Sequence, residues 1–235
     1  MALPFFFEEN LSSQSTFILS EETSKHVIQV LRMHKGEKLK MTDGKGRVLT
    51  SQIIYENKKA TEVQFLSVEI QQAPTKKITI AISLIKNNSR FEWFLEKATE
   101  IGVNEIIPLI CHRTEKEKLR SSRLEQLLIS AMLQSRQVWL PDLHEPTSIS
   151  QLVENAAYEK KYIAHCEDGL KNNLANEGFT NAGSMLMLIG PEGDFTPGEI
   201  KQALDKGFKP VTLGENRLRT ETAGVVAATL LRLNQ

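Results

Sequence analysis

The chain has 235 residues, of which 40% are hydrophobic and 25% are charged. This composition is typical of a globular protein with a sizeable core and argues against a disordered chain. The 29 basic and 29 acidic residues give a net charge of zero, which excludes a protein that binds nucleic acid through bulk charge. Because we find neither a signal peptide nor an apolar run of membrane-spanning length, we expect a soluble, cytoplasmic protein.

Short strands are predicted over most of the first 70 residues. Apolar or alternating runs occupy 5–7, 16–19, 38–42, 47–55 and 61–70. The turn-forming tetrapeptide Asp-Gly-Lys-Gly at 43–46 separates two of these runs. One helix is predicted over Glu21–Met33, with Val27, Val30 and Leu31 on one face. Many short strands around glycine turns favour a small antiparallel barrel, and 71–75 is interpreted as a linker.

From residue 76 onward, apolar strands alternate with helical segments. Strands are predicted over 78–84, 104–110, 161–166, 185–189 and 211–213, and helices over 89–101, 119–138, 196–207 and 220–231. Ser89 and Thr196 are each expected to open a helix with a capping box, and Gly102 is expected to follow the end of one. The alternation predicts an α/β domain with a mostly parallel sheet covered on both faces. Ligands of such sheets bind beyond the carboxyl ends of the strands.

Several common chemistries lack their sequence signatures. There is no G-x-G-x-x-G after the first strand of the α/β region, no Walker loop and no G-x-S-x-G elbow. The five histidines lack metal-binding spacing, so no metal site is expected. Cys111 and Cys166 suggest neither a zinc site nor a disulfide framework, and we expect both to be buried free thiols.

Two loops remain as candidate sites, at 188–196 and 213–224, each between a predicted strand and a predicted helix. Thr220 is predicted to be an N-cap, with Glu221 in the first helical turn, where the helix dipole favours an anion. Plain strand-to-helix turns would explain most of these features. They explain Arg217 and Arg219 less well, because cations at a helix N-terminus oppose the dipole. These arginines suggest an anionic partner or nearby carboxylates.

Two motifs together closely resemble the ribosomal RNA small subunit methyltransferase E family. They are Gly-Pro-Glu-Gly-Asp-Phe-Thr-x-x-Glu at 190–199 and Leu-Gly-x-x-x-Leu-Arg-Thr-Glu-Thr-Ala at 213–223. The segment His-Val-x-x-Val-Leu-Arg at 26–32 resembles the signature of the family's N-terminal barrel, and 86–102 resembles the first helix of its catalytic domain. The resemblance covers essentially the whole chain. In many members a second glycine stands at the position of Asp194.

The resemblance implies a PUA-like β-barrel RNA-binding domain over 1–72 and a SPOUT-class methyltransferase domain with a trefoil knot over 76–235. It implies a homodimer that transfers a methyl group from S-adenosyl-L-methionine to N3 of one uridine (uridine 1498 in the family) of 16S rRNA in the small ribosomal subunit. The cofactor would lie bent in the knot, held by the backbone of the two loops. The residues carried over for cofactor binding are Ile189, Gly190, Glu192, Gly193, Leu213, Gly214, Leu218, Arg219 and Thr222.

Methylation of uracil N3 requires that its proton be removed or that the resulting anion on O2 and O4 be stabilised. Glu221 is the first candidate base and Glu192 the second, although either carboxylate could instead be structural and pair with Arg219. Arg219 and Arg90 are candidates to hold phosphate or the uracil oxygens. Arg90 could equally be a solvated residue in the first turn of its helix.

Two short basic runs break the overall neutrality. Residues 32–47 contain six basic side chains against two acidic ones, and 113–123 contain five against two. The expected RNA contacts are His26, Arg32, Lys45, Arg47, Arg113 and Arg136, whereas a solvated face would explain either run alone. In many members the arginine of the segment around Arg136 stands one position later, which weakens that assignment. Two other functions remain open: a SPOUT methyltransferase acting on another RNA, and a non-catalytic RNA-binding assembly factor.

Overall fold

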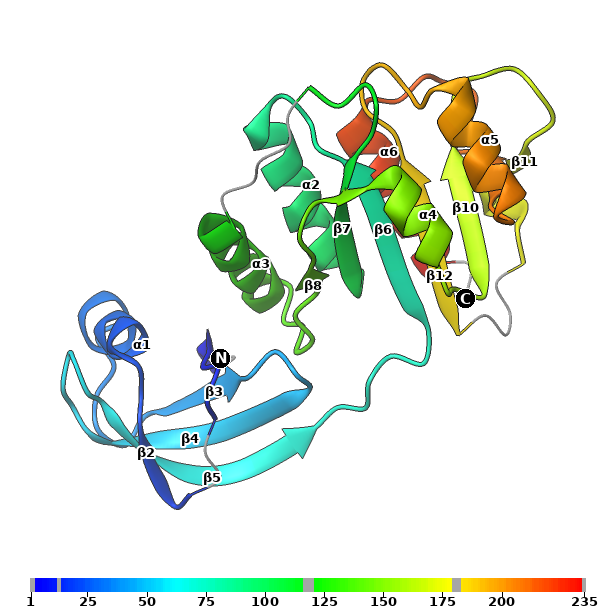
Figure 1. The fold of residues 1–235 in the computed structure, drawn as a ribbon. Coiled ribbons are helices and arrows are strands. Elements are labelled where there is room, and N and C mark those ends of the chain that lie inside the picture. Colours follow the sequence, from blue (N-terminus) through cyan, green and yellow to red (C-terminus); the bar gives the residue numbers. More distant parts are fainter. Residues whose placement is uncertain (1–2, 12–13, 116–120, 179–182, 234–235) are drawn as a thin grey trace. The chain divides into compact units, whose positions relative to one another are not determined.

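The computed structural model describes residues 3–11, 14–115, 121–178 and 183–233. The chain forms two compact units, each of which is visible in Figure 1. The first unit contains Met1–Ala73 together with Met132–Leu140, and the second contains Pro74–Ala131 and Pro141–Gln235. The segment 132–140, which the sequence analysis places in the second domain, therefore belongs to the first unit.

A five-stranded sheet forms the first unit. Its strand order is β1 (Phe5–Phe7), β3 (Lys38–Thr42), β4 (Arg47–Tyr55), β5 (Glu62–Ile70) and β2 (Thr16–Ile18). The β1–β3 pairing is parallel and the other three are antiparallel. Alternate side chains of the strands, among them Leu39, Leu49 and Val63, form a core that excludes water. All five predicted strands are confirmed, with the two at 16–19 and 61–70 each shorter by one residue at one end.

The predicted helix over Glu21–Met33 is only partly correct. An α-helix, α1 (Glu21–Lys25), is followed by one π-helical turn, His26–Val30. The wider π turn changes the helical period, so that Val27 is fully buried whereas Val30 and Leu31 are 66% and 44% exposed. The three side chains therefore do not share one buried face. The segment ends at Arg32, which adopts a left-handed backbone with φ of 54°.

Residues 132–140 join the first unit through the turn between β3 and β4. The Gly46 N–H donates to the Val138 carbonyl at 2.9 Å, and the Leu140 N–H donates to the Gly44 carbonyl at 2.8 Å. A methyl group added at Gly46 would approach the Trp139 ring and lie 2.8 Å from the Gln71 carbonyl. The glycine turn, predicted only as a link between strands, thus also provides the attachment point for a distant segment.

The second unit contains an eight-stranded sheet in which all pairings are parallel. Its order is β11 (Asn172–Asn173), β13 (Lys209–Thr212), β10 (Lys160–Ala164), β12 (Ser184–Ile189), β6 (Lys77–Ser83), β7 (Glu105–Ile110) and β8 (Asp142–Leu143), and β9 (Thr147–Ser148) also pairs with β7. The parallel α/β architecture expected from the sequence is confirmed. The short strands β8, β9 and β11 were not predicted, since two-residue segments carry no usable periodicity.

Helices cover both faces of this sheet (Figure 1). Helices α4 (Ile149–Asn155) and α5 (Pro197–Asp205) pack together, and α2 (Asn88–Ile101) packs against α6 (Thr220–Leu233). Ala81 of β6 contributes to the core beneath α4 and α5, whereas the next residue, Ile82, faces Gly224 of α6. Because successive strand side chains point to opposite faces, these helix pairs lie on opposite sides. The short α4 and the 3-10 turn Leu174–Asn176 were not predicted.

Helix termini provide a direct test of the capping predictions. The box at Thr196 is confirmed, because Thr196 and Glu199 exchange the expected hydrogen bonds and Pro197 is the first helical residue. The box at Ser89 is wrong: Asn87 caps α2 and accepts the Ser89 N–H at 2.9 Å. Gly102 ends α2 in a left-handed conformation, as expected. Helix α3 spans Ser121–Gln134 and ends before the predicted Val138.

Candidate active site

A cavity of about 620 Å³ lies at the carboxyl ends of β10, β12 and β13, within the range of about 300–1,000 Å³ common for small-molecule sites. Its walls come from the loop after each strand and from the start of α6. The lining residues are Ala164, His165, Cys166, Lys171, Ile189, Gly190, Pro191, Glu192, Asp194, Val211, Thr212, Leu213, Gly214, Glu215, Asn216, Arg217, Leu218, Arg219, Thr220 and Ala223. The two loops singled out in the sequence thus meet in one cavity.

The loop after β12 makes a tight turn that depends on Asp194. The Asp194 N–H donates to the Pro191 carbonyl at 2.9 Å, and Asp194 has a φ of 63°. Glycine adopts this left-handed region without a side-chain clash, which gives a physical reason for the glycine that many relatives have there. The Asp194 carboxylate offsets the cost by accepting the backbone N–H groups of Cys166 at 2.7 Å and Phe195 at 2.8 Å.

Gly190 and Thr220 join the two loops directly. The buried Thr220 hydroxyl donates to the Gly190 carbonyl at 3.0 Å. Thr220 is already the first residue of α6, so the prediction that it serves as N-cap is wrong: its hydroxyl is used for a tertiary contact. A methyl group at Gly190 would lie 3.1 Å from the Phe195 ring. This side of the cavity is therefore bounded by backbone and a buried ring.

The loop after β13 supplies the opposite wall. Gly214 has a φ of 134°, and the Thr212 hydroxyl donates to its carbonyl at 2.7 Å. Of the nine residues carried over for cofactor binding, the structure places seven in the cavity wall: Ile189, Gly190, Glu192, Leu213, Gly214, Leu218 and Arg219. Gly193 lies in the same loop with its carbonyl bound to Arg113, and Thr222 is half-buried in α6.

The four candidate catalytic residues fall into two groups. Glu192 and Arg219 are exposed side chains of the cavity lining. Glu221 is 6% exposed, and its Oε1 lies 3.6 Å from Nε of Arg90. Neither Glu221 nor Arg90 belongs to the cavity lining formed by the described residues. The structural pairing considered for Glu221 is therefore with Arg90 rather than with Arg219.

His165 is a cavity residue that the sequence analysis missed. The predicted strand 161–166 extends too far: β10 ends at Ala164, so His165 lies in the loop beyond it. Both ring nitrogens are buried and have no hydrogen-bond partner among the described residues. Burial, followed by the charge of Lys171, lowers the pKa of His165, while Asp194 and Glu167 act in the opposite direction. The ring is neutral at pH 7 and carries one donor and one acceptor.

Five of the six expected RNA contacts belong to the first unit: His26, Arg32, Lys45, Arg47 and Arg136. His26, Arg32, Lys45 and Arg136 are exposed, whereas Arg47 donates to the Leu11 carbonyl at 3.3 Å and its Nε lies 3.8 Å from Asp43 Oδ2. Arg136 has a left-handed backbone, with φ of 56°, at the end of α3. Arg113 belongs to the second unit, and 116–120 of its basic run lies outside the described residues.

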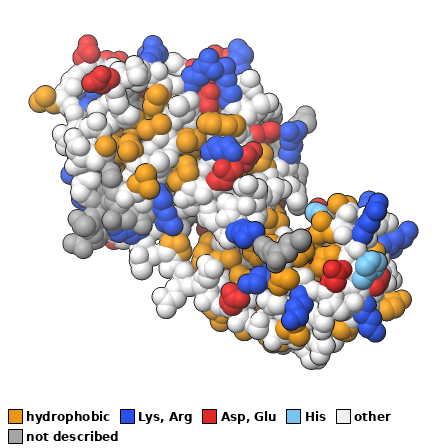
Figure 2. All heavy atoms as spheres, turned by 180° about the vertical axis from the view of Figure 1, so that it is seen from behind, with side chains coloured by type: hydrophobic (Ala, Val, Ile, Leu, Met, Phe, Trp, Pro, Cys, Tyr) orange, Lys and Arg blue, Asp and Glu red, His pale blue; other side chains and the backbone are white. Residues whose placement is uncertain are grey.

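The surface charge is mixed on the face drawn in Figure 2. Lys and Arg side chains lie singly or in small groups among acidic, apolar and other side chains. No cluster of His, Cys, Asp and Glu that could hold a metal ion is found among the described residues. In the same part of the chain, no helix is long and apolar enough to cross a membrane.

Comparison with known proteins supports what the fold and the cavity indicate. A model of the RNA methyltransferase domain matches residues 71–232, and one of the RNA methyltransferase PUA domain matches 19–66. "Ribosomal RNA small subunit methyltransferase E" from Synechocystis is 30% identical, covering 91% of this chain and 72% of the relative. The Aquifex aeolicus protein of the same name is 28% identical, covering 97% of both chains.

Solved structures are similar over almost the full length. The crystal structure of a probable rRNA-methyltransferase from Porphyromonas gingivalis has a TM-score of 0.91 and 35% identity, covering 99% of this chain and 98% of the other. A ribosomal RNA small subunit methyltransferase E from Neisseria gonorrhoeae, bound to S-adenosyl methionine, has a TM-score of 0.85 and 29% identity, covering 97% and 95%.

The parallel sheet with its loop-built cavity and the N-terminal PUA-like unit define an RNA methyltransferase. Both cavity loops carry the motifs quoted above, and the relatives match along nearly the whole chain. The chain belongs to the ribosomal RNA small subunit methyltransferase E family.

Proposed function

We propose that this protein transfers a methyl group from S-adenosyl-L-methionine to N3 of one uridine of 16S rRNA in the small ribosomal subunit, corresponding to uridine 1498 in the family. The observation that carries the proposal is the cavity in which the two family motifs meet at the carboxyl ends of β12 and β13. It is supported by the relative from Neisseria gonorrhoeae, whose structure contains S-adenosyl methionine.

The chemistry of the cavity fits this cofactor. Its wall at Gly190 is bare backbone, and a methyl group there would meet Phe195, so main-chain groups are available to a polar, flexible ligand. Ile189, Gly190 and Glu192 from one loop, and Leu213, Gly214, Leu218 and Arg219 from the other, would hold it. Gly193 and Thr222 would act from just behind the wall. When bound, S-adenosyl-L-methionine supplies the electrophilic methyl group, and no metal is required.

The protein's own contribution is proton removal and charge stabilisation. We assign proton abstraction from uracil N3 to Glu221, which its pairing with Arg90 keeps in place, and we keep Glu192 as the second candidate base. Arg219 and Arg90 are positioned at the start of α6 and in the first turn of α2. Their guanidinium groups would stabilise the anion that develops on O2 and O4 or bind an adjacent phosphate.

We assign RNA binding to the first unit, the proposed PUA-like domain over 1–72, acting with the methyltransferase domain over 76–235. Arg32 and Arg136 both hold left-handed backbone conformations at positions where glycine would be easier. Strain of this kind is retained when the side chain or the local structure is used. The proposal includes His26, Lys45 and Arg47, and it also includes a trefoil knot, a homodimer and a cytoplasmic location, which the family resemblance implies.

Primer extension across 16S rRNA tests this function. An N3 methyl group blocks Watson–Crick pairing, so reverse transcriptase should stop one nucleotide before the modified uridine in RNA from cells that express the protein. RNA from a deletion strain should lack the stop, and the wild-type gene should restore it. An unchanged pattern of stops after deletion would contradict the assigned target. A protein that binds RNA but leaves every stop unchanged and does not bind the cofactor would be the non-catalytic assembly factor.

The two thiols provide a readout of cofactor binding in the native protein. The thiolate is the reactive form of cysteine. Burial, with a further contribution from the charge of Glu199, raises the pKa of the Cys111 thiol to about 12, and Cys111 is 5% exposed. Cys166 is exposed and lines the cavity, contrary to the expectation of two buried thiols. Iodoacetamide should therefore alkylate Cys166 and spare Cys111, and saturating S-adenosylmethionine should slow the reaction of Cys166.

Mass spectrometry of tryptic peptides follows the two sites separately. The protein unfolded in urea is the control and should be labelled at both cysteines. Equal labelling of Cys111 and Cys166 in the native protein would contradict the packing described here. A labelling rate at Cys166 that does not respond to the cofactor would count against its binding in this cavity.

A further inference from the structure

Arg113 is bound to the loop after β12. Its Nη1 donates to the Gly193 carbonyl at 2.6 Å and lies 3.5 Å from the Phe195 carbonyl. These contacts link residues 80 and 82 positions apart in the sequence. A guanidinium that donates to a carbonyl forms a charge-assisted hydrogen bond, stronger than a bond between neutral groups. The arginine expected to contact RNA is thus directed at the backbone of a cavity loop.

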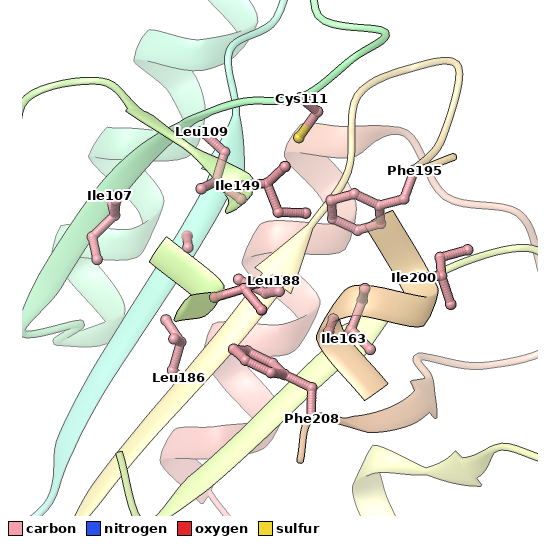
Figure 3. Packing of buried hydrophobic residues seen from close by; sticks show 13 residues of the cluster. Ile107, Leu109, Cys111, Ile149, Ile163, Leu186, Leu188, Phe195, Ile200 and Phe208 are labelled. Atoms are coloured by element: carbon pink, nitrogen blue, oxygen red, sulfur yellow. The ribbon is translucent and has the colours of Figure 1, made fainter. Parts of the chain in front are cut away.

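The aliphatic part of Arg113 also packs against the loop. A methyl group added at Gly193 would lie 3.3 Å from Arg113 Cδ and 3.5 Å from its Cβ. On the other side, the fully buried Phe195 ring anchors the same loop in the core, among Ile149, Ile200 and neighbouring apolar side chains (Figure 3). The loop is therefore held from the interior by Phe195 and from the surface by Arg113.

The backbone around Arg113 is itself fixed. The preceding His112 N–H donates to Oε1 of Glu199 at 2.8 Å, and the other oxygen of this buried carboxylate accepts the Thr196 N–H at 2.7 Å. The Thr114 hydroxyl accepts the Cys111 N–H at 2.8 Å. Because the base of the arginine is tied to the first turn of α5, its guanidinium can hold the loop in one path.

We propose that Arg113 is a positioning residue that sets the path of the 190–195 loop for cofactor binding, and that it does not act mainly as an RNA contact. This inference rests on the proposed function. Arg113 acts through the Gly193 and Phe195 carbonyls, so its loss should affect cofactor affinity more than the chemical step. The expected result for Arg113→Gln is a rise of about tenfold in the Kd and KM for S-adenosylmethionine, with a much smaller change in kcat at saturating cofactor.

Arg123→Gln is the matched control. It removes one charge from the same basic run, but Arg123 pairs with Glu92 at 2.9 Å and is 72% exposed. Calorimetry with S-adenosylmethionine and salt-dependent binding of a 16S rRNA fragment should be measured for both variants. We expect Arg113→Gln to weaken cofactor binding alone, with an RNA affinity and salt slope equal to those of Arg123→Gln. Arg113→Lys keeps the charge with one compact donor group and should restore part of the cofactor affinity.

The opposite pattern would overturn the inference. Cofactor affinity unchanged in Arg113→Gln, together with weaker RNA binding and a salt slope reduced by about one, would make Arg113 a phosphate contact. Hydrogen exchange of the 190–195 amides gives a readout that is independent of the cofactor. Exchange should accelerate in Arg113→Gln and not in Arg123→Gln, and equal exchange in the two would contradict the positioning role. If the wild-type protein fails to bind S-adenosylmethionine, the proposed function fails, while the exchange experiment still tests the role of Arg113.

Discussion

Replacing Glu221 by Gln is expected to reduce methyl transfer by about 10²- to 10⁴-fold, the usual contribution of a positioned general base. The amide has nearly the same shape as the carboxylate but cannot accept the N3 proton. Glu221 does not line the cavity described above, so cofactor binding should be preserved. Its partner Arg90 is 39% exposed and can be hydrated, so the fold should tolerate the loss of one charge.

Single-turnover transfer of labelled methyl to 16S rRNA, together with calorimetry of the cofactor, measures the two effects separately. Glu192→Gln is the comparison variant, because Glu192 is the exposed carboxylate that does line the cavity. A fully active Glu221→Gln protein would eliminate Glu221 as the base. A large loss of turnover confined to Glu192→Gln would transfer the role to Glu192.

Replacing Gly46 by Ala should lower the free energy of unfolding by about 2–5 kcal/mol. The φ of 88° costs a residue with a Cβ about 1–2 kcal/mol. Overpacking against the Trp139 ring and the Gln71 carbonyl, only 2.8 Å from the added methyl group, contributes about 1–3 kcal/mol more. Against a total stability of about 5–15 kcal/mol for a typical domain, this is a large loss.

Gly36 separates the two contributions. It has almost the same φ, 92°, but the nearest atom to an added methyl group is Gln52 Nε2 at 4.0 Å. Gly36→Ala should therefore show the conformational cost alone. Urea denaturation followed by Trp fluorescence gives both values, and the difference between them measures the packing of Gly46. Equal destabilisation by the two variants would show that the contact with Trp139 and Gln71 adds nothing.

The parts of the fold that could be predicted are those determined by nearby residues. Thr196, Pro197 and Glu199 cap one helix through contacts within one turn, and Gly102 ends another. The π turn at His26–Val30 could not be anticipated, because its residues have no side-chain pattern that distinguishes it from an α-helix. Asn87 and Ser89 are both acceptable caps, so the helix start could not be chosen from the sequence.

The candidate site shows the same division. Its two loops were found from their motifs, and seven of the nine residues assigned to the cofactor do line the cavity. His165 was missed, because its significance depends on where β10 ends and on the burial of both its ring nitrogens. The contact of Arg113 with Gly193 links positions 80 residues apart. Local sequence signals carry no information about such a pair.

The placement of Met132–Leu140 in the first unit has a consequence for how the protein is made and dissected. A fragment that ends at the linker would leave the Gly46 N–H and the Gly44 carbonyl without the partners that Val138 and Leu140 provide. On the ribosome, the N-terminal sheet would likewise wait for residue 140 to emerge before its turn is completed. The N-terminal module is therefore discontinuous along the gene, and a faithful isolated version requires the later segment to be joined to it.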